Sequence, residues 1–430
     1  MYTVESIKTY SQESVKISSV RMVSIVDVMF SFLMIQYVVF PRAYMWLKAI
    51  TLVLLMVATY LQLDGKLRFT GYSLLIAVYI LFNILFTAIG TIKGFGEVAI
   101  RSATVFIIWP STYFIFSGYR LSEDRLRKFF RLMVFFSFFI CAISTVVIMS
   151  DVLHLSFVVS FLSRFRLGGY ASLSGLPYFR TEHIFFFAFF TPFMLSCLMM
   201  DKAQLRKARI NISFLKLITI YLFCLSILSG MGAIWIAVLS GTVLCVLRSR
   251  ILKQQNVVIL LTVLMAAGIM FVAVSYYRKG LVYYIFQEIG SRLYQDEISE
   301  NELIRHNQIE AMINAWKESP FFGNGIGSSV RYYRGTELVE QSANEMTYFV
   351  MLYQRGLIGV GLFFMVAVFS VRSLIQRKDA SWLCEPFSIG MICFLIANSF
   401  NPYLSNMSTL WILFLPFILG NNCANDENNE

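Results

Sequence analysis

Residues 344–359 read NEMTYFVMLYQRGLIG, and this stretch raises the main structural question in the sequence. Glu345 opens an apolar run, Arg355 interrupts it, and Gly356 and Gly359 close it. An ionisable side chain about ten residues into a continuous membrane helix lies roughly 15 Å deep and is a functional candidate. If Gly356 instead breaks the helix, Arg355 lies near the headgroups and its side chain snorkels.

The composition predicts a membrane protein with many spans. Of the 430 residues, 58% are hydrophobic and 14% are charged, against about half and a quarter in soluble domains. A soluble fold of this size could not bury so much apolar surface. Segments of about 20 apolar residues are long enough to cross a bilayer. We therefore expect an all-α, polytopic fold with about twelve transmembrane helices, at 22–40, 44–62, 72–92, 99–118, 132–150, 184–200, 214–229, 232–247, 257–277, 346–371, 386–402 and 405–420.

The distribution of Lys and Arg predicts the orientation of the chain. Basic residues are concentrated in one set of connections, at 120–131, 202–209, 248–253 and 372–378. Under the positive-inside rule, these connections and both termini are cytoplasmic. Residues 1–430 then form a single membrane domain with two long outward-facing loops, 151–183 and 278–345. The net charge of +11 follows from this topology, and no nucleic-acid recognition module accompanies it.

The loop 278–345 contains a predicted amphipathic helix. Ser299 and Glu302 have the spacing of a capping box, and apolar residues repeat at helical spacing at Ile309, Met312 and Trp316. The stretch SPFFGNGIGSS, residues 319–329, then ends the helix. Its three spaced glycines are not preceded by a strand or followed by a helix with Lys-Ser/Thr. They indicate a tight turn and not a nucleotide loop.

The loop 151–183 is rich in arginine and poor in acid. Arg164, Arg166 and Arg180 are accompanied by one carboxylate, Glu182, within 163–183. Guanidinium groups bind phosphate oxygens in a bidentate manner, so this loop suits a phosphate or pyrophosphate. Contact with anionic headgroups explains the same residues equally well.

Taken together, these features resemble one superfamily. An Arg precedes a P-x-x-G-x-G turn by some fifteen residues, as Arg305 does here, and an acid or His stands nine to eleven residues ahead of a G-x-x-G, as Glu345 does ahead of Gly356 and Gly359. With about a dozen spans and a large outer loop late in the chain, this pattern is similar to the O-antigen ligases and the O-antigen or exopolysaccharide polymerases. The specific likeness covers roughly 300–360.

The resemblance implies an architecture and an activity. The fold would be GT-C-like, as in lipid-linked glycosyltransferases, in the bacterial inner membrane. The activity would be polymerisation of undecaprenyl-pyrophosphate-linked oligosaccharide repeat units at the outer face of that membrane, without metal or cofactor. A flippase and a chain-length regulator would be its partners. Glu345 stands where ligases carry His, and Met231 in 228–237 stands where relatives often carry Arg. Both departures favour a polymerase over a ligase.

The resemblance and the residue chemistry together give a set of candidate site residues. Glu345 is expected to act as a base or orienting acid, and Arg305 is the second catalytic candidate, expected to bind the pyrophosphate. As an alternative, Glu345 caps the helix that follows it. The expected substrate-binding residues are Arg164, Arg166, Arg180, Arg331, Arg334 and Arg355. No metal site is expected.

Two other functions remain open at this point. An O-antigen ligase would catalyse the same kind of glycosyl transfer, but to a different lipid acceptor. A lipid-linked oligosaccharide flippase would also have about a dozen spans, but it should show two similar halves joined by short loops. The absence of an obvious internal repeat and the two long loops on one face favour an enzyme.

Overall fold

A computed structural model describes residues 25–63, 65, 69, 71–117, 122–173, 176–200, 205, 209–248, 300–342, 345–376 and 382–421. Within them the chain is mostly helical, as the apolar periodicity predicted. The expected span 257–277 and the capping residue Ser299 lie outside the described residues.

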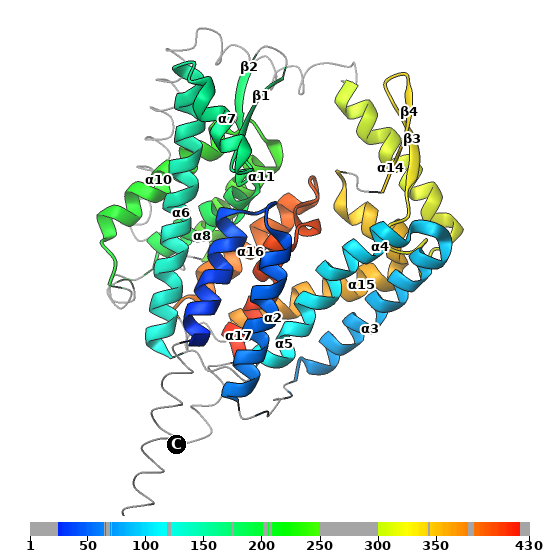
Figure 1. Cartoon of the computed structure of the whole chain (residues 1–430), viewed down its shortest axis with the longest axis horizontal. Coiled ribbons are helices and arrows are strands. Elements are labelled where there is room, and N and C mark those ends of the chain that lie inside the picture. Colours follow the sequence, from blue (N-terminus) through cyan, green and yellow to red (C-terminus); the bar gives the residue numbers. More distant parts are fainter. Residues whose placement is uncertain are drawn as a thin grey trace, which may run out of the picture.

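The helices and strands follow one another along the chain and are shown in Figure 1. A first apolar helix spans Ile25–Val39. The further α-helices are α2 (Met45–Gln62), α3 (Ser73–Gly90), α4 (Gly96–Ala103), α5 (Trp109–Phe116), α6 (Glu123–Val152), α7 (Ser156–Arg164), α8 (Phe187–Leu198), α10 (Ile212–Leu228), α11 (Gly232–Arg248), α14 (Glu300–Glu318), α15 (Thr347–Ile375), α16 (Cys384–Asn398) and α17 (Trp411–Asn421). Two π-helical segments, η1 (Thr91–Phe95) and η2 (Thr104–Ile108), flank α4, and three short 3₁₀ turns are η3 (Ile184–Phe186), η4 (Tyr403–Ser405) and η5 (Met407–Thr409).

Four of the described helices are long and apolar enough to cross a membrane: Met45–Gln62, Ser73–Ala103, Glu123–Ser150 and Thr347–Ile375. Shorter apolar helices coincide with the other expected spans, apart from 257–277. Large apolar side chains are exposed along these helices, and Leu74 and Leu81 on α3 are 75% and 63% exposed. Such faces suit a lipid environment, so the chain is a helical membrane protein.

The expected spans 72–92 and 99–118 are both represented by helices, and the chain turns between them at Gly94, whose φ is 94°. The structure corrects two other expectations from the sequence. The basic connection 120–131 is largely helix, since α6 begins at Glu123. The fold is also not purely α: antiparallel hairpins β1–β2 (Gly169–Leu173 and Leu176–Arg180) and β3–β4 (Val330–Arg334 and Glu337–Gln341) occur within the two long loops.

The hairpins mark one end of the helical bundle. In Figure 1, α7, β1–β2, α14 and β3–β4 lie at the top, while the starts of the first helix and of α6 lie at the bottom. We call these the hairpin end and the opposite end. At the centre is α8, all twelve residues of which are buried, and it packs against α10, α11 and α16. A helix that is apolar all round needs this enclosed position.

Helix α15 is broken at Gly356, whose φ and ψ are 63° and −170°. The turn at 319–328, called the glycine turn here, inserts its backbone into the break. Asn324 N–H and Gly325 N–H donate to the carbonyls of Tyr353 and Gln354, both at 2.8 Å. On the other side of the break, the N–H groups of Leu357 and Ile358 donate to the carbonyls of Pro320 and Phe321, at 2.9 and 3.2 Å. The backbone groups freed by the break therefore have partners, as a helix interrupted inside a membrane protein requires.

The glycine turn also contacts the kinked segment between α3 and α4. Ile326 N–H donates to the Phe86 carbonyl at 3.0 Å, and Lys93 donates to Asn324 Oδ1 at 2.9 Å. Gly323, Gly325 and Gly327 all have positive φ, and a Cβ on any of them would lie within 3 Å of a backbone atom of α15, α3 or α4. The predicted tight turn is confirmed, and its glycines allow three backbones to meet.

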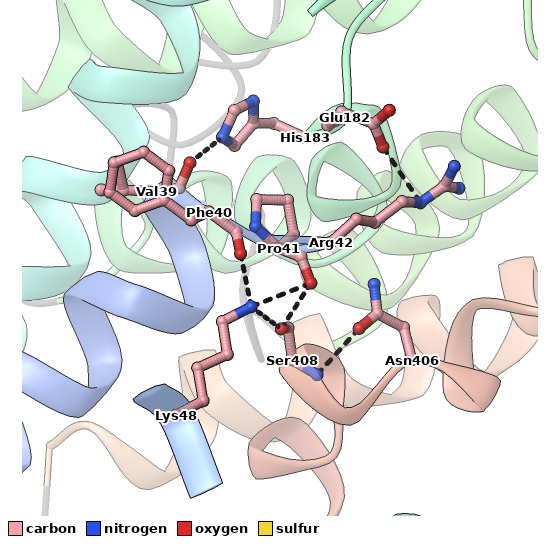
Figure 2. A network of polar contacts seen from close by, with 9 residues as sticks. All are labelled: Val39, Phe40, Pro41, Arg42, Lys48, Glu182, His183, Asn406 and Ser408. Carbon is pink, nitrogen blue, oxygen red and sulfur yellow. Dashed lines mark hydrogen bonds and ion pairs between the residues drawn. The ribbon is translucent and has the colours of Figure 1, made fainter. Parts of the chain in front are cut away.

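A second polar network joins the corner before α2 to the segment before α17 (Figure 2). The Lys48 ammonium, fully buried, donates to the carbonyls of Phe40 and Pro41 and, at 3.0 Å, to Ser408 Oγ. Ser408 Oγ in turn donates to the Pro41 carbonyl at 2.7 Å. Three acceptors match the three N–H groups of the ammonium, which explains how this cation is accommodated among apolar helices.

A hydrogen bond from His183, which lies between β2 and α8, links that segment to the corner before α2. Its Nε2–H donates to the Val39 carbonyl at 2.8 Å, and the imidazole is fully buried. Beside it, Glu182 forms an ion pair with Arg42 at 3.0 Å. Burial lowers the pKa of His183 to about 4, because the protonated ring would lose its hydration.

Replacing Gly356 by Ala should break the contact between α15 and the glycine turn. A Cβ there would lie 2.2 Å from the Phe321 carbonyl oxygen, and backbone strain of about 1–3 kcal/mol would add to that clash. We expect a loss of more than about 3 kcal/mol in the free energy of unfolding, measured by unfolding in detergent. The matched control is Gly361→Ala in the same helix, where a Cβ meets nothing within 4 Å. It should be neutral or stabilising by about 0.5–1 kcal/mol, and equal effects of the two changes would contradict the proposed contact.

His183 should make stability depend on pH. Since its folded pKa lies below the ordinary 6.5, the unfolded chain binds more protons between pH 6.5 and 4, so stability falls as the pH falls through that window. We expect a loss on the order of 1 kcal/mol from pH 7 to 5.5, measured as the melting temperature. His183→Gln should weaken this dependence, whereas His154→Gln, at an exposed histidine, should leave it unchanged. An identical pH profile in all three proteins would exclude His183 as its source.

Candidate functional site

The structure brings together the two residues that the sequence nominated as catalytic. Arg305 lies near the start of α14, and Glu345 lies just ahead of α15, forty positions later. Arg305 Nε donates to Glu345 Oε2 at 3.0 Å. Both side chains are accessible, at 42% and 50% exposure, at the hairpin end of the bundle. The pair is therefore open to a ligand from that side.

Packing of α14 against α15 positions this pair. Met312 on α14, Tyr332 on β3 and Tyr353 on α15 form a small buried cluster, with Ile309 and Trp316 packed beside it. A helix is thus present where the sequence predicted one, and Ile309, Met312 and Trp316 lie on the side of α14 that packs against α15. Since the glycine turn fixes the end of α14, Arg305 is held three to four turns away, level with Glu345.

Glu345 does not cap the helix that follows it. The N-cap residue of α15 is Met346, which makes no side-chain capping hydrogen bond, and the first turn of α15 contains no acid. Thr347 instead fixes the start of α15, donating from its hydroxyl to the Asn401 carbonyl at 3.0 Å. The alternative that Glu345 serves as a cap is wrong, because Arg305 holds its carboxylate.

The single hydrogen bond of this pair leaves further donor and acceptor atoms on both side chains. Arg305 uses Nε and Glu345 uses Oε2. Within the described residues, no other hydrogen bond engages Glu345 Oε1 or the terminal guanidinium nitrogens of Arg305. A carboxylate oxygen can accept a hydroxyl proton, and guanidinium N–H groups can bind phosphate oxygens. One pair therefore offers a proton acceptor and an anion-binding group side by side.

The other candidates on β3–β4 have a different setting. Arg331 forms an ion pair with Glu340 at 2.7 Å across the hairpin. Hydrogen bonds from Ser329 and Arg331 lower the pKa of the Glu340 carboxyl. Arg334 is exposed at the end of β3. Arg331 thus has an internal partner, and of these two Arg334 is the more available to an anion.

Arg164, Arg166 and Arg180 lie on the other hairpin-bearing segment. Arg164 ends α7, Arg166 follows with a positive φ of 52°, and Arg180 ends β2. All three are exposed. Glu182, the one acid within 163–183, is held by Arg42, and no ion pair joins the three arginines to any carboxylate that the structure describes. No hydrogen bond or ion pair connects them to Arg305 and Glu345 within those residues, although Figure 1 places α7, β2 and α14 at the hairpin end.

Arg355 occupies a third environment. The break at Gly356 is present, but Arg355 does not snorkel: it is 3% exposed. Its guanidinium carbon lies 3.6 Å from the centre of the Phe106 ring, and the Tyr79 hydroxyl interacts with the guanidinium. Its Nε and Nη1 make no hydrogen bond with any described residue. A substrate-binding role for Arg355 stays a prediction.

Sequence reasoning missed several residues that shape the site. Gln354 donates to the carbonyls of Ser328 and Ser342, at 3.0 and 3.1 Å. The Tyr353 hydroxyl lies within hydrogen-bonding distance of the same two carbonyls and is closer to that of Ser328, at 2.8 Å. These bonds join α15 to both ends of the β3–β4 segment. The residues stand inside an apparently continuous apolar run, so no local signal marked them. No cluster of three or more His, Cys, Asp or Glu suited to a metal ion occurs among the described residues.

The Arg305–Glu345 ion pair should contribute little to stability. Exposed ion pairs are typically worth less than about 1 kcal/mol, so Arg305→Gln, Glu345→Gln and the double change should each lower the free energy of unfolding by less than that. The control is Met312→Ala, which removes a buried side chain of α14 and should cost about 2–5 kcal/mol. A loss in either pair variant as large as in the control would mean that the pair is structural. Thermal unfolding of the purified variants measures all four.

Comparison with known proteins does not assign a function to this site. No protein-family model matches the chain, and no curated protein matches it significantly. The likeness of residues 300–360 to the O-antigen ligase and polymerase superfamily therefore rests on the motifs themselves.

Proposed function

We propose that this protein is a membrane glycosyltransferase that polymerises lipid-linked oligosaccharide repeat units. The carrier would be undecaprenyl pyrophosphate, and the product an O-antigen or exopolysaccharide. In this proposal the chain has about twelve spans in a GT-C-like arrangement in the bacterial inner membrane. The hairpin end faces away from the cytoplasm, and both termini lie inside.

The observation that carries the proposal is the accessible Arg305–Glu345 pair. It stands where α15 begins, and among the described residues nothing else engages Glu345 Oε1 or the terminal guanidinium nitrogens of Arg305. Glycosyl transfer from a pyrophosphate needs a base for the acceptor hydroxyl and positive charge for the leaving group. The pair supplies both functions within hydrogen-bonding distance of each other.

The reaction balances with these two residues and two lipid-linked substrates. The acceptor hydroxyl oxygen attacks the anomeric carbon of the donor glycan and passes its proton to Glu345. The bond from that carbon to the pyrophosphate oxygen breaks, and the electron pair leaves with undecaprenyl pyrophosphate. Arg305 stabilises the negative charge that develops on the leaving oxygen. The proton on Glu345 is then released to solvent.

The arginines of the first long loop would extend this positive surface. Arg164, Arg166 and Arg180 are exposed and have no carboxylate partner among the described residues, so they can bind phosphates of a donor or an acceptor lipid. Arg334 contributes similarly from β3. A chain-length regulator and a flippase would act with the enzyme, since repeat units must reach this face and polymerisation must stop.

The test is complementation of a deletion strain in the native bacterial host, with surface glycan resolved on a gel. For a polymerase, deletion should collapse the ladder to a single repeat unit, and wild type should restore it. Glu345→Gln and Arg305→Gln should each lower polymer by more than tenfold. The matched controls are Glu97→Gln and Arg101→Gln, which alter another exposed ion pair, on α4, and should restore the ladder fully.

Two other outcomes would reject the polymerase assignment. Loss of all attached glycan, with long polymer accumulating on the lipid carrier, would identify a ligase. Accumulation of single repeats on the cytoplasmic side would identify a flippase. Normal ladders from Glu345→Gln and Arg305→Gln at wild-type protein levels would exclude the pair as the site.

A further inference from the structure

A pocket lies between helices at the opposite end of the bundle, away from the candidate site. It is a small pocket, with a volume of about 70 Å³, below the range of sites that enclose a whole drug-sized ligand. The first helix, the end of α5, the start of α6 and α17 line it. None of its residues belongs to the Arg305–Glu345 region.

The charged and the apolar residues that line the pocket lie in different parts of it. Among the described residues, the charged side chains that line it are Asp27, Arg125 and Lys128, and each lies near the first turns of its helix. Farther along the helices the lining is apolar, with Phe129, Leu132 and Leu415 among its residues. From Arg125 to Leu132 the rise along α6 is about 10 Å. The pocket thus combines a charged mouth with an apolar interior about two turns deep.

Among the described residues, the charged side chains that line the pocket carry a net positive charge. Arg125 pairs with Asp27 at 3.0 Å, and Lys128 reaches the other oxygen of the same carboxylate only at 3.6 Å. One carboxylate therefore faces two cations, and the Lys128 side chain is 66% exposed. Lys128 can turn toward an incoming anion without breaking the closer Arg125–Asp27 pair.

We propose that this pocket is a binding site for an anionic phospholipid of the leaflet opposite the hairpins. One acyl chain would enter between the first helix and α6, and the phosphate would meet Lys128 and Arg125. Basic pockets between membrane helices bind such headgroups on the cytoplasmic side. The apolar interior excludes a free phosphate as the main ligand, and the excess positive charge favours anionic over zwitterionic lipid.

The test is lipid titration of the purified full-length protein, read by native mass spectrometry. Phosphatidylglycerol should bind more tightly than phosphatidylcholine. Lys128→Gln should weaken phosphatidylglycerol binding about fivefold, the effect of one basic residue near an anionic headgroup, and should leave phosphatidylcholine unchanged. Arg101→Gln removes an equally exposed base outside the pocket and should change neither.

A second variant tests the apolar part of the pocket. Ser31 lines it, and its hydroxyl donates only to the Asp27 carbonyl in its own helix. Ser31→Phe should fill the pocket and lower binding of phosphatidylglycerol more than tenfold. Ser31→Leu, a smaller change, should do so partially and guards against misfolding of the larger variant. Melting temperatures establish that each variant is folded.

Several outcomes would overturn the proposal. Equal binding of both phospholipids, unaffected by Lys128→Gln and Ser31→Phe, would show only a general lipid shell. Displacement of phosphatidylglycerol by inorganic phosphate alone would show a headgroup site without a chain pocket. Tighter binding of a polyprenyl phosphate than of phosphatidylglycerol, sensitive to the same variants, would assign the pocket to an isoprenoid carrier.

Discussion

The interruption of α15 at Gly356 is the constraint on which the hairpin end of this protein depends. A helix broken among apolar surroundings leaves carbonyls on one side and N–H groups on the other without partners, at a cost of several kcal/mol each. The glycine turn satisfies both sets with its own backbone. It can approach closely enough only because Gly323 and Gly356 lack side chains, since a Cβ on either would lie 2.2–2.4 Å from backbone atoms.

This contact determines where the candidate site lies. The turn directly follows α14, so anchoring it in α15 fixes one end of α14, and the cluster around Met312 aligns the rest. Arg305 then reaches Glu345 across two segments that are forty residues apart in sequence. The alignment of α14 with α15 brings the ion pair together. The pair itself does not hold the two helices in place, because an exposed ion pair contributes too little energy for that. Such a pair is free to be optimised for a ligand.

The sequence predicted the apolar helices well, because lipid-facing and buried segments share one composition. It also predicted a helix at α14 and the turn after it, where helical periodicity and glycine spacing are local signals. It missed the start of α6 at Glu123, because the charged residues at that end of the helix were assigned to a loop. The two hairpins were also not predicted, because their strands are short and lie within polar loops. Of the candidate site, the two residues were nominated separately, and only the structure shows that they meet.

Arg355 shows why a buried cation beside a break differs from one in a continuous helix. It is the last residue of the segment Thr347–Arg355, and a helix carries partial negative charge at its C-terminal end. The Phe106 ring lies under the guanidinium and the Tyr79 hydroxyl interacts with it, so two further sources of electron density face the charge. No described carboxylate is needed to hold it there. The break therefore stabilises the deep cation directly, while the turn that repairs the break aligns α14. By contrast, Arg305 remains half-exposed, so a ligand can reach its charge without moving a helix.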